Sequence, residues 1–164
     1  MELMKIRLYV LLSSLVLCAA CGPHQVKGQP PFIGISSLSM QENSLAARLD
    51  IRNINDVELD IDAIDIKLRV RDVELTHYVN DLKLTVDPNT TEEVSLDGLP
   101  DINARQQLME LESGHVSSLP FSLEGRVHTI RDGYLPFKNQ GHLYPVPGRP
   151  GQFRSASSRT REQR

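Results

Sequence analysis

The strongest constraint on the fold of this chain is an alternation of apolar and polar residues with a period of two, clearest between Leu59 and Arg71. From Leu59 to Ala63 the apolar residues occupy odd positions, and from Ile64 onward they occupy even positions. This alternation predicts a β-strand with one buried face, and Ile, Val and Asp are also poor helix formers. The change of phase predicts a β-bulge at Ala63–Ile64, because a one-residue slip would otherwise turn every later side chain to the wrong face.

The same period recurs along most of the chain. Further strands are predicted at residues 33–40, 45–52, 73–77, 82–86, 94–96, 119–129 and 135–143. Polar turn clusters separate them, including Asn53–Asp56, Asp87–Thr91 and a tight hairpin turn at Arg71-Asp72. Because these short spacings leave no room for repeated helical crossovers, we predict an all-β fold: an antiparallel β-sandwich with one short helix.

The one helix predicted after the signal segment lies at residues 101–111. Asp101 can cap its N-terminus, and its predicted buried side consists of Ile102, Leu108, Met109 and Leu111. The chain has no Trp and few other aromatic residues, so its core is expected to be built from Leu, Ile and Val.

The N-terminal residues have the organisation of a bacterial lipoprotein signal. Lys5 and Arg7 precede an apolar run from Leu8 to Leu17, and small residues stand directly before Cys21. The run is shorter than the roughly 20 residues that a membrane-spanning helix needs. We therefore expect residues 1–20 to be cleaved as a signal peptide; an ordinary secretory signal is the alternative.

Lipidation is the expected modification of the mature N-terminus. Palmitate and other acyl chains on Cys21 would anchor the protein stably in a membrane. Gly22 stands where an Asp would retain a lipoprotein in the inner membrane. The expected location is therefore the bacterial cell envelope, at the outer membrane facing the periplasm. Loss of Cys18 with the signal leaves no pair of cysteines for an intramolecular disulfide.

Composition divides the mature chain into three parts. Residues 21–31, rich in Gly and Pro, are expected to form a flexible tether, residues 32–146 the folded domain, and residues 147–164 a disordered basic tail. Residues 24–148 contain 11 Lys and Arg against 19 Asp and Glu, a net charge of −8, whereas residues 149–164 carry a net charge of +4. The acidic body argues against nucleic acid as a partner, because Lys and Arg supply most of that affinity.

Catalytic, cofactor and metal sites are not predicted. The histidines at 77, 115, 128 and 142 show no metal-ligand spacing. The residues Asp56, Asp60, Asp62 and Asp65 suggest either a calcium site or a solvated acidic face; the solvated face is favoured because no calcium-loop motif is present. Asn53 and Asn55 are expected to cap backbone groups in their turn rather than to bind a substrate.

The order of these elements resembles the water stress and hypersensitive response domain of the late embryogenesis abundant (LEA) type 2 family. The resemblance rests on Leu49–Asn55 after a strand, on the strand ending at Arg71-Asp72, on Phe121–Gly125 and on Gly133–Gly141. It covers about residues 32–143, with Ile54 where the family usually has Pro. It implies an Ig-like or fibronectin type III-like sandwich with one helix and a part in desiccation, osmotic or cold tolerance.

Two functions remain open. The first is a noncatalytic stress-protection module tethered to the membrane, acting on client proteins or envelope components. The second is an envelope binding or assembly module that accepts a partner at a sheet edge or through its loops. No enzyme activity is expected, and we expect a monomer without cofactors.

Overall fold

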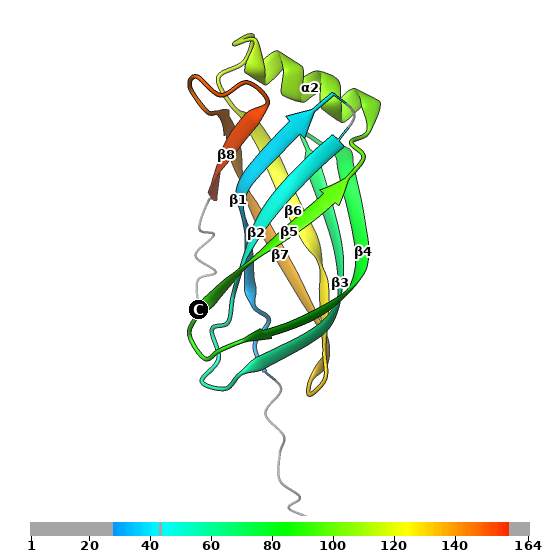
Figure 1. Cartoon of the computed structure of the whole chain (residues 1–164), viewed down its shortest axis with the longest axis vertical. Coiled ribbons are helices and arrows are strands. Elements are labelled where there is room, and N and C mark those ends of the chain that lie inside the picture. Colours follow the sequence, from blue (N-terminus) through cyan, green and yellow to red (C-terminus); the bar gives the residue numbers. More distant parts are fainter. Residues whose placement is uncertain (1–27, 43, 158–164) are drawn as a thin grey trace, which may run out of the picture.

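The structure is a computed structural model that describes residues 28–42 and 44–157 (Figure 1). The predicted signal peptide, Cys21 and most of the predicted tether lie outside these residues. The elements are β1 (Phe32–Gln41), β2 (Ser44–Arg52), β3 (Leu59–Val70), β4 (Val73–Val86), β5 (Thr91–Gly98), α2 (Ile102–Glu112), β6 (Leu119–Thr129), β7 (Gly133–Pro145) and β8 (Gln152–Ser157).

The strands form one antiparallel sheet in the order β4-β3-β6-β7-β8-β1-β2-β5. The sheet curls until it is nearly closed and barrel-like, with edge strands β4 and β5 facing each other, and α2 lies across one end (Figure 1). The predicted all-β antiparallel class with one short helix is confirmed. The strands are joined in one sheet rather than in the two packed sheets that the sandwich prediction required, because β8 bonds to both β7 and β1.

The long strand β3 contains the predicted irregularity at a slightly different place. Its register shifts against both β4 and β6 between Ile61 and Ala63, so Asp62 lies at the break. The ladder is regular across Ala63–Ile64, and the predicted position of the bulge is wrong. Ala63 is half-buried. Its methyl group is small enough for either face, so the apolar pattern did not reveal where the extra residue lies.

The hairpin between β3 and β4 is as tight as predicted. Arg71 and Asp72 both have positive φ, 49° and 69°. Two successive left-handed residues match the twist of antiparallel strands and close a two-residue hairpin without Gly. Arg71 also forms an ion pair with Glu110 of α2, at 3.6 Å.

Helix α2 begins where the sequence predicts. The Asp101 carboxylate accepts hydrogen bonds from the backbone N–H groups of Asn103, at 2.8 Å, and Ala104, at 3.3 Å. This carboxylate satisfies two of the four N–H groups that a helix leaves unpaired at its start. The predicted cap is therefore confirmed.

The buried side of α2 is only partly as predicted. Ala104, Leu108 and Leu111 are buried, whereas Ile102 and Met109 are 77% and 52% exposed. Residues four and seven positions apart share one face of a helix. Ile102 and Met109 form a second stripe, turned away from the open end of the sheet that α2 covers, so their predicted burial is wrong.

The C-terminal residues are ordered further than predicted. Residues 147–157 are described, and β8 pairs with β7 and β1. Phe153 is 1% exposed, and the Met40 N–H donates to the Gly151 carbonyl at 2.7 Å. The prediction of disorder from residue 147 is wrong over these residues, because flanking strands supply hydrogen bonds that composition does not reveal. Residues 158–164 lie outside the described part of the chain.

The core is aliphatic, as predicted, and fills the inside of the curled sheet. Leu, Ile and Val supply most of its side chains, with Phe121, Phe153 and Tyr78 as its buried aromatic residues. Among residues 28–42 and 44–157, no helix has the length and apolar character needed to cross a membrane.

Candidate functional site

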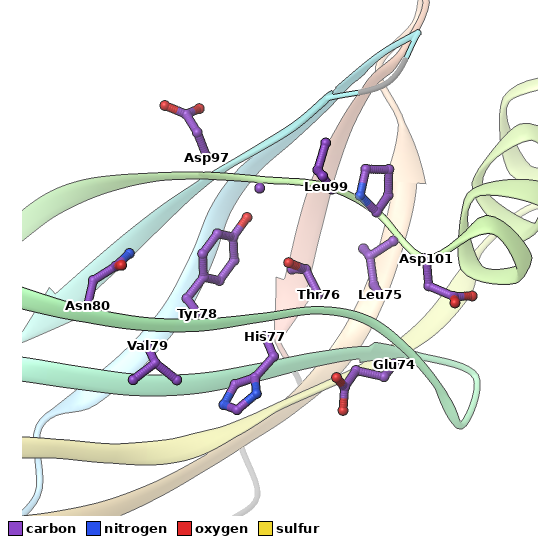
Figure 2. Close-up of a pocket in the computed structure, with 12 residues that line it drawn as sticks. Glu74, Leu75, Thr76, His77, Tyr78, Val79, Asn80, Asp97, Leu99 and Asp101 are labelled. Atoms are coloured by element: carbon purple, nitrogen blue, oxygen red, sulfur yellow. The ribbon is translucent and has the colours of Figure 1, made fainter.

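The curled sheet leaves a cleft where β4 and β5 face each other next to α2. We call it the seam cleft; it is lined by residues 74–80 of β4 and 97–101 of β5 and the following loop (Figure 2). Tyr78, Thr76 and Asn80 point from β4 toward β5, while His77 and Val79 point to the other side of β4 (Figure 2). The cleft is therefore the unpaired seam of a nearly closed sheet.

Side chains span this seam where backbone hydrogen bonds are missing. The Tyr78 hydroxyl donates to the Leu96 carbonyl of β5 at 3.2 Å. A methyl group added at Gly98 would lie 3.0 Å from Thr76 Oγ1 and from the Tyr78 ring. A phenol ring fits between two strands only if their backbones lie farther apart than the roughly 4.8 Å of paired strands. Nearer α2, the Asp101 N–H donates to the Leu75 carbonyl at 3.0 Å and closes the seam.

The seam cleft is acidic and partly apolar. Its lining residues, all described, include Glu74, Asp97 and Asp101 but no Lys or Arg. Val79 and Leu99 are 65% and 78% exposed. Burial raises the pKa of the Tyr78 hydroxyl, with a further contribution from the charge of Asp97, so the phenol stays protonated and keeps its donor role.

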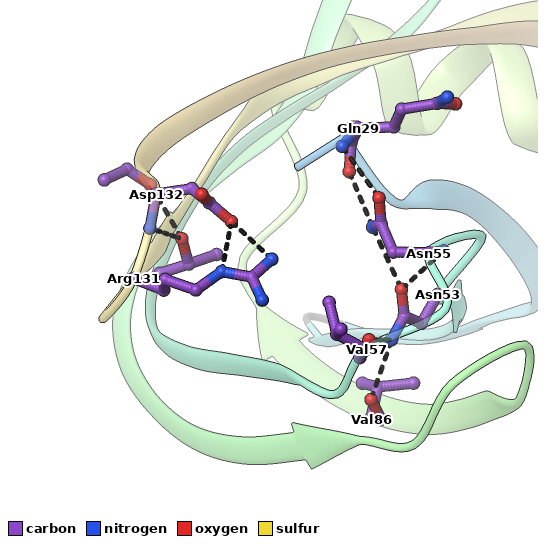
Figure 3. Close-up of polar contacts among 9 residues, drawn as sticks. Gln29, Asn53, Asn55, Val57, Val86, Arg131 and Asp132 are labelled. Atoms are coloured by element: carbon purple, nitrogen blue, oxygen red, sulfur yellow. Dashed lines mark hydrogen bonds and ion pairs between the residues drawn. The ribbon is translucent and has the colours of Figure 1, made fainter. Parts of the chain in front are cut away.

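The opposite end of the molecule is built around a buried asparagine (Figure 3). Asn53 is fully buried, and its Nδ2 donates to the carbonyls of Val57, at 2.7 Å, and Val86, at 3.0 Å. Its Oδ1 accepts from the Asn55 N–H at 2.9 Å. The Asn53 N–H donates to the Thr90 carbonyl at 3.0 Å. One amide thus joins the β2–β3 loop to the β4–β5 turn, and the predicted capping role is confirmed.

The start of the described chain is attached at this same end. The Gln29 N–H donates to Asn55 Oδ1 at 2.8 Å, and Asn55 Nδ2 donates to the Gln29 carbonyl at 3.0 Å. A methyl group added at Gly28 would lie 2.7 Å from Asp132 Oδ2, whose carboxylate pairs with Arg131 at 3.0 Å. The end of the predicted tether therefore runs between the β2–β3 loop and the β6–β7 hairpin.

The acidic residues weighed as calcium ligands hydrogen-bond to protein groups instead. Asp65 binds His77 at 2.7 Å and Arg126 at 3.1 Å; the hydrogen bond from His77, with the charge of Arg126, lowers the pKa of the Asp65 carboxyl. The other contacts are Asp62 with His128, Asp60 with Thr85, and Asp56 with Asn89. Across residues 28–42 and 44–157, no three His, Cys, Asp or Glu side chains form a group that could hold a metal ion.

Two of the four histidines in the described part of the chain therefore belong to outer-face pairs on β3, β4 and β6. The ring of His128 also lies 4.6 Å from that of Tyr134, which Arg126 covers at 4.8 Å. His115 contacts Ser113, and His142 is exposed on β7. The pairs of His77 with Asp65 and of His128 with Asp62 order a polar outer face on β3, β4 and β6.

Sequence reasoning missed the seam cleft because β4 was predicted as two strands, 73–77 and 82–86. The interruption coincides with Val79–Asp81, three consecutive exposed residues. A strand at the edge of a sheet can expose both faces, which removes the alternation. The break in period was the available signal of an edge. Cys21, the predicted lipidation site, lies outside the described residues.

Comparisons with known proteins agree with the family resemblance. The family model described as late embryogenesis abundant protein (LEA type 2) matches residues 48–141, more than half of the chain, from β2 into β7. No curated protein matches the sequence significantly.

Two solved structures match this chain at low sequence identity, and the first of them supports the fold. A protein from Arabidopsis thaliana, known from its solution structure, is 9% identical with a TM-score of 0.52, over 77% of this chain and 90% of its own. A protein from Archaeoglobus fulgidus, known from its crystal structure, is 10% identical with a TM-score of 0.42, over 70% of this chain and 96% of its own. On the family match, which spans most of the folded domain, this chain belongs to the late embryogenesis abundant type 2 family.

Proposed function

We propose that this protein is a membrane-anchored, noncatalytic lipoprotein whose LEA type 2 domain protects proteins or the envelope during desiccation, osmotic or cold stress. The family match over residues 48–141 is the observation that carries the proposal. The outer face of β3, β4 and β6 supports it physically. It presents Asp, His and Arg side chains that pair with one another and stay in contact with water. A hydrated, acidic body of this kind can keep neighbouring proteins apart as water is lost.

The protective function is tested by freezing or drying a labile enzyme together with the chain from Gly22 onward. We expect the enzyme to retain more activity than with an equal mass of albumin, because a charged body separates partly unfolded molecules. The measurement is residual enzyme activity and light scattering after rehydration. Protection no better than that of albumin would remove the support for this function.

The membrane anchor is tested at Cys21. Each buried methylene of an acyl chain contributes about 0.8 kcal/mol to membrane binding, so two or more acyl chains hold a protein stably at the membrane. Cells labelled with a palmitate analogue should therefore yield a labelled protein in the membrane fraction, and Cys21→Ala should abolish both the label and the fractionation. Cys18→Ala is the matched control and should leave both unchanged. An unlabelled mature protein would argue for a simply secreted chain.

A second candidate function, envelope assembly, is favoured by the seam cleft. The facing edges of β4 and β5 are unpaired, and Val79 and Leu99 beside them are exposed. An extended segment of a partner could add to the β4 edge by backbone hydrogen bonds. Recovery of a stoichiometric partner from crosslinked membranes would favour this function over protection.

A further inference from the structure

One end of the molecule gathers exposed apolar residues on several separate loops. We call it the loop end: residues 28–32, 53–58, 87–90 and 130–132, opposite α2 (Figure 1). Its exposed apolar side chains are Phe32 (44%), Ile54 (42%), Val57 (44%) and Ile130 (73%). Val57, Pro88 and Ile130 line the same shallow cleft, although they come from three different loops. Single exposed apolar residues need no explanation, but a group from several loops on one surface does.

The chain enters the domain at this end. Gln29 makes two hydrogen bonds with Asn55 (Figure 3). Gly28 lies against the Arg131–Asp132 ion pair. Only seven residue steps separate Gly28 from Cys21. Fully extended, they span at most about 25 Å. An acyl chain on Cys21 therefore holds the loop end within this distance of the bilayer.

When the domain stands upright on the membrane, its α2 end lies farther from the bilayer than the tether can reach. β6 runs from the α2 end to the loop end and contains 11 residues. At about 3.3 Å per residue it extends roughly 36 Å. The loop end is thus the part of the domain that meets the membrane when the molecule stands on its tether.

We propose that the loop end is a membrane-contact surface, with Ile54, Val57 and Ile130 entering the headgroup region of the bilayer to which the chain is anchored. This inference rests on the proposed lipid anchor and adds the orientation of the domain. The seam cleft and α2 then point away from the bilayer, toward the aqueous space.

The charge of the loop end indicates which lipid headgroups it can contact. Asp56, Glu58 and Asp87 lie in its loops beside the apolar residues. Carboxylates are repelled by an anionic surface, and Arg131 is already paired with Asp132. The surface fits a bilayer rich in zwitterionic phospholipid, which the apolar side chains enter without electrostatic attraction.

The chain offers a matched pair of positions for the test. It contains no Trp, so a single introduced Trp reports on one position only. Ile130 at the loop end and Ile102 on α2 are both isoleucines, and their exposures are 73% and 77%. The variants Ile130→Trp and Ile102→Trp therefore place a Trp at opposite ends of the molecule, at positions that are almost equally exposed.

The experiment uses the chain from Cys21 onward, coupled through the Cys21 thiol to a maleimide lipid in phosphatidylcholine vesicles. Brominated lipids quench only a Trp that enters the bilayer. We expect a blue shift and loss of emission for Ile130→Trp, and neither for Ile102→Trp. Replacing part of the phosphatidylcholine with phosphatidylglycerol at low salt should weaken the quenching of Ile130→Trp.

The outcomes separate this inference from the anchor on which it rests. Equal quenching of both variants, or quenching of neither, overturns the loop-end contact. Stronger quenching of Ile130→Trp in anionic vesicles overturns the preference for zwitterionic lipid. Because the lipid is coupled chemically, none of these results depends on acylation in the cell. Failure of the palmitate labelling would overturn the anchor alone, and the vesicle measurement would still report whether the loop end enters a bilayer.

Discussion

Asn53→Asp is expected to destabilise the domain by about 3–5 kcal/mol at neutral pH, the cost of an uncompensated buried charge. The substitution hardly changes the shape of the side chain but removes its N–H donors. A carboxylate oxygen would then face the carbonyls of Val57 and Val86, which Asn53 Nδ2 now approaches to 2.7 and 3.0 Å. Urea unfolding of the chain from Gly22 onward, followed by circular dichroism, measures the loss.

The loss should depend on pH in a defined direction. Burial against carbonyl oxygens would raise the pKa of the new carboxyl in the folded state above its unfolded value of about 4. The penalty is therefore smallest below pH 4, where the acid is protonated in both states, and grows as the pH rises toward the folded pKa. Asn80→Asp is the control, since Asn80 is exposed on β4. Equal effects of the two substitutions would show that Asn53 does not join the loops as described.

Gly125→Ala is expected to destabilise the domain by about 3 kcal/mol or more, at the upper end of overpacking effects. A Cβ at this position would lie 2.0 Å from the Asp65 carbonyl oxygen and 3.0 Å from Ile66 Cα. Both atoms belong to the backbone of β3, which pairs with β6 at this level. A strand hydrogen-bonded on both sides cannot move aside as a flexible side chain would, so the clash must separate β3 from β6 or bend them.

The control for Gly125→Ala is the variant Ser122→Ala on the same strand. Ser122 belongs to the outward-facing positions of β6, and its change should stay within about 0.5 kcal/mol. Thermal and urea unfolding of both variants gives the two values. A Gly125→Ala protein as stable as Ser122→Ala would mean that β3 and β6 lie farther apart than the structure places them.

Several parts of the fold follow from the sequence because they depend on local physical chemistry. The period-two pattern determines which side chains of β3 and β6 face the core. The Asp101 carboxylate accepts from N–H groups at the start of its own helix, and Arg71-Asp72 closes a hairpin whose flanking strands already alternate. Asn favours turns because its side chain bonds to nearby backbone groups, as Asn53 Oδ1 does with the Asn55 N–H. Each of these features depends mainly on residues that are close together in the sequence, so it can be predicted from the sequence.

The candidate sites depend on contacts between distant segments and could be predicted only in part. The seam cleft exists because β4 and β5 end the order of the sheet, which no local pattern specifies. The histidines on β4 and β6 could be recognised as isolated, but their pairing with Asp65 and Asp62 required the register of β3. The loop end brings together four segments that are far apart in sequence.

What the sequence by itself determined is therefore most of the strands, the inward and outward faces of β3 on either side of its bulge, the capped helix and the family. The tertiary structure decided that β8 completes a single sheet, that Ile102 and Met109 face outward, and that Gly28 and Gln29 are fixed to the loop end. The physical reason is that strand formation in β8 depends on hydrogen bonds offered by β7 and β1, and burial depends on what lies opposite a side chain. A linear pattern contains neither piece of information.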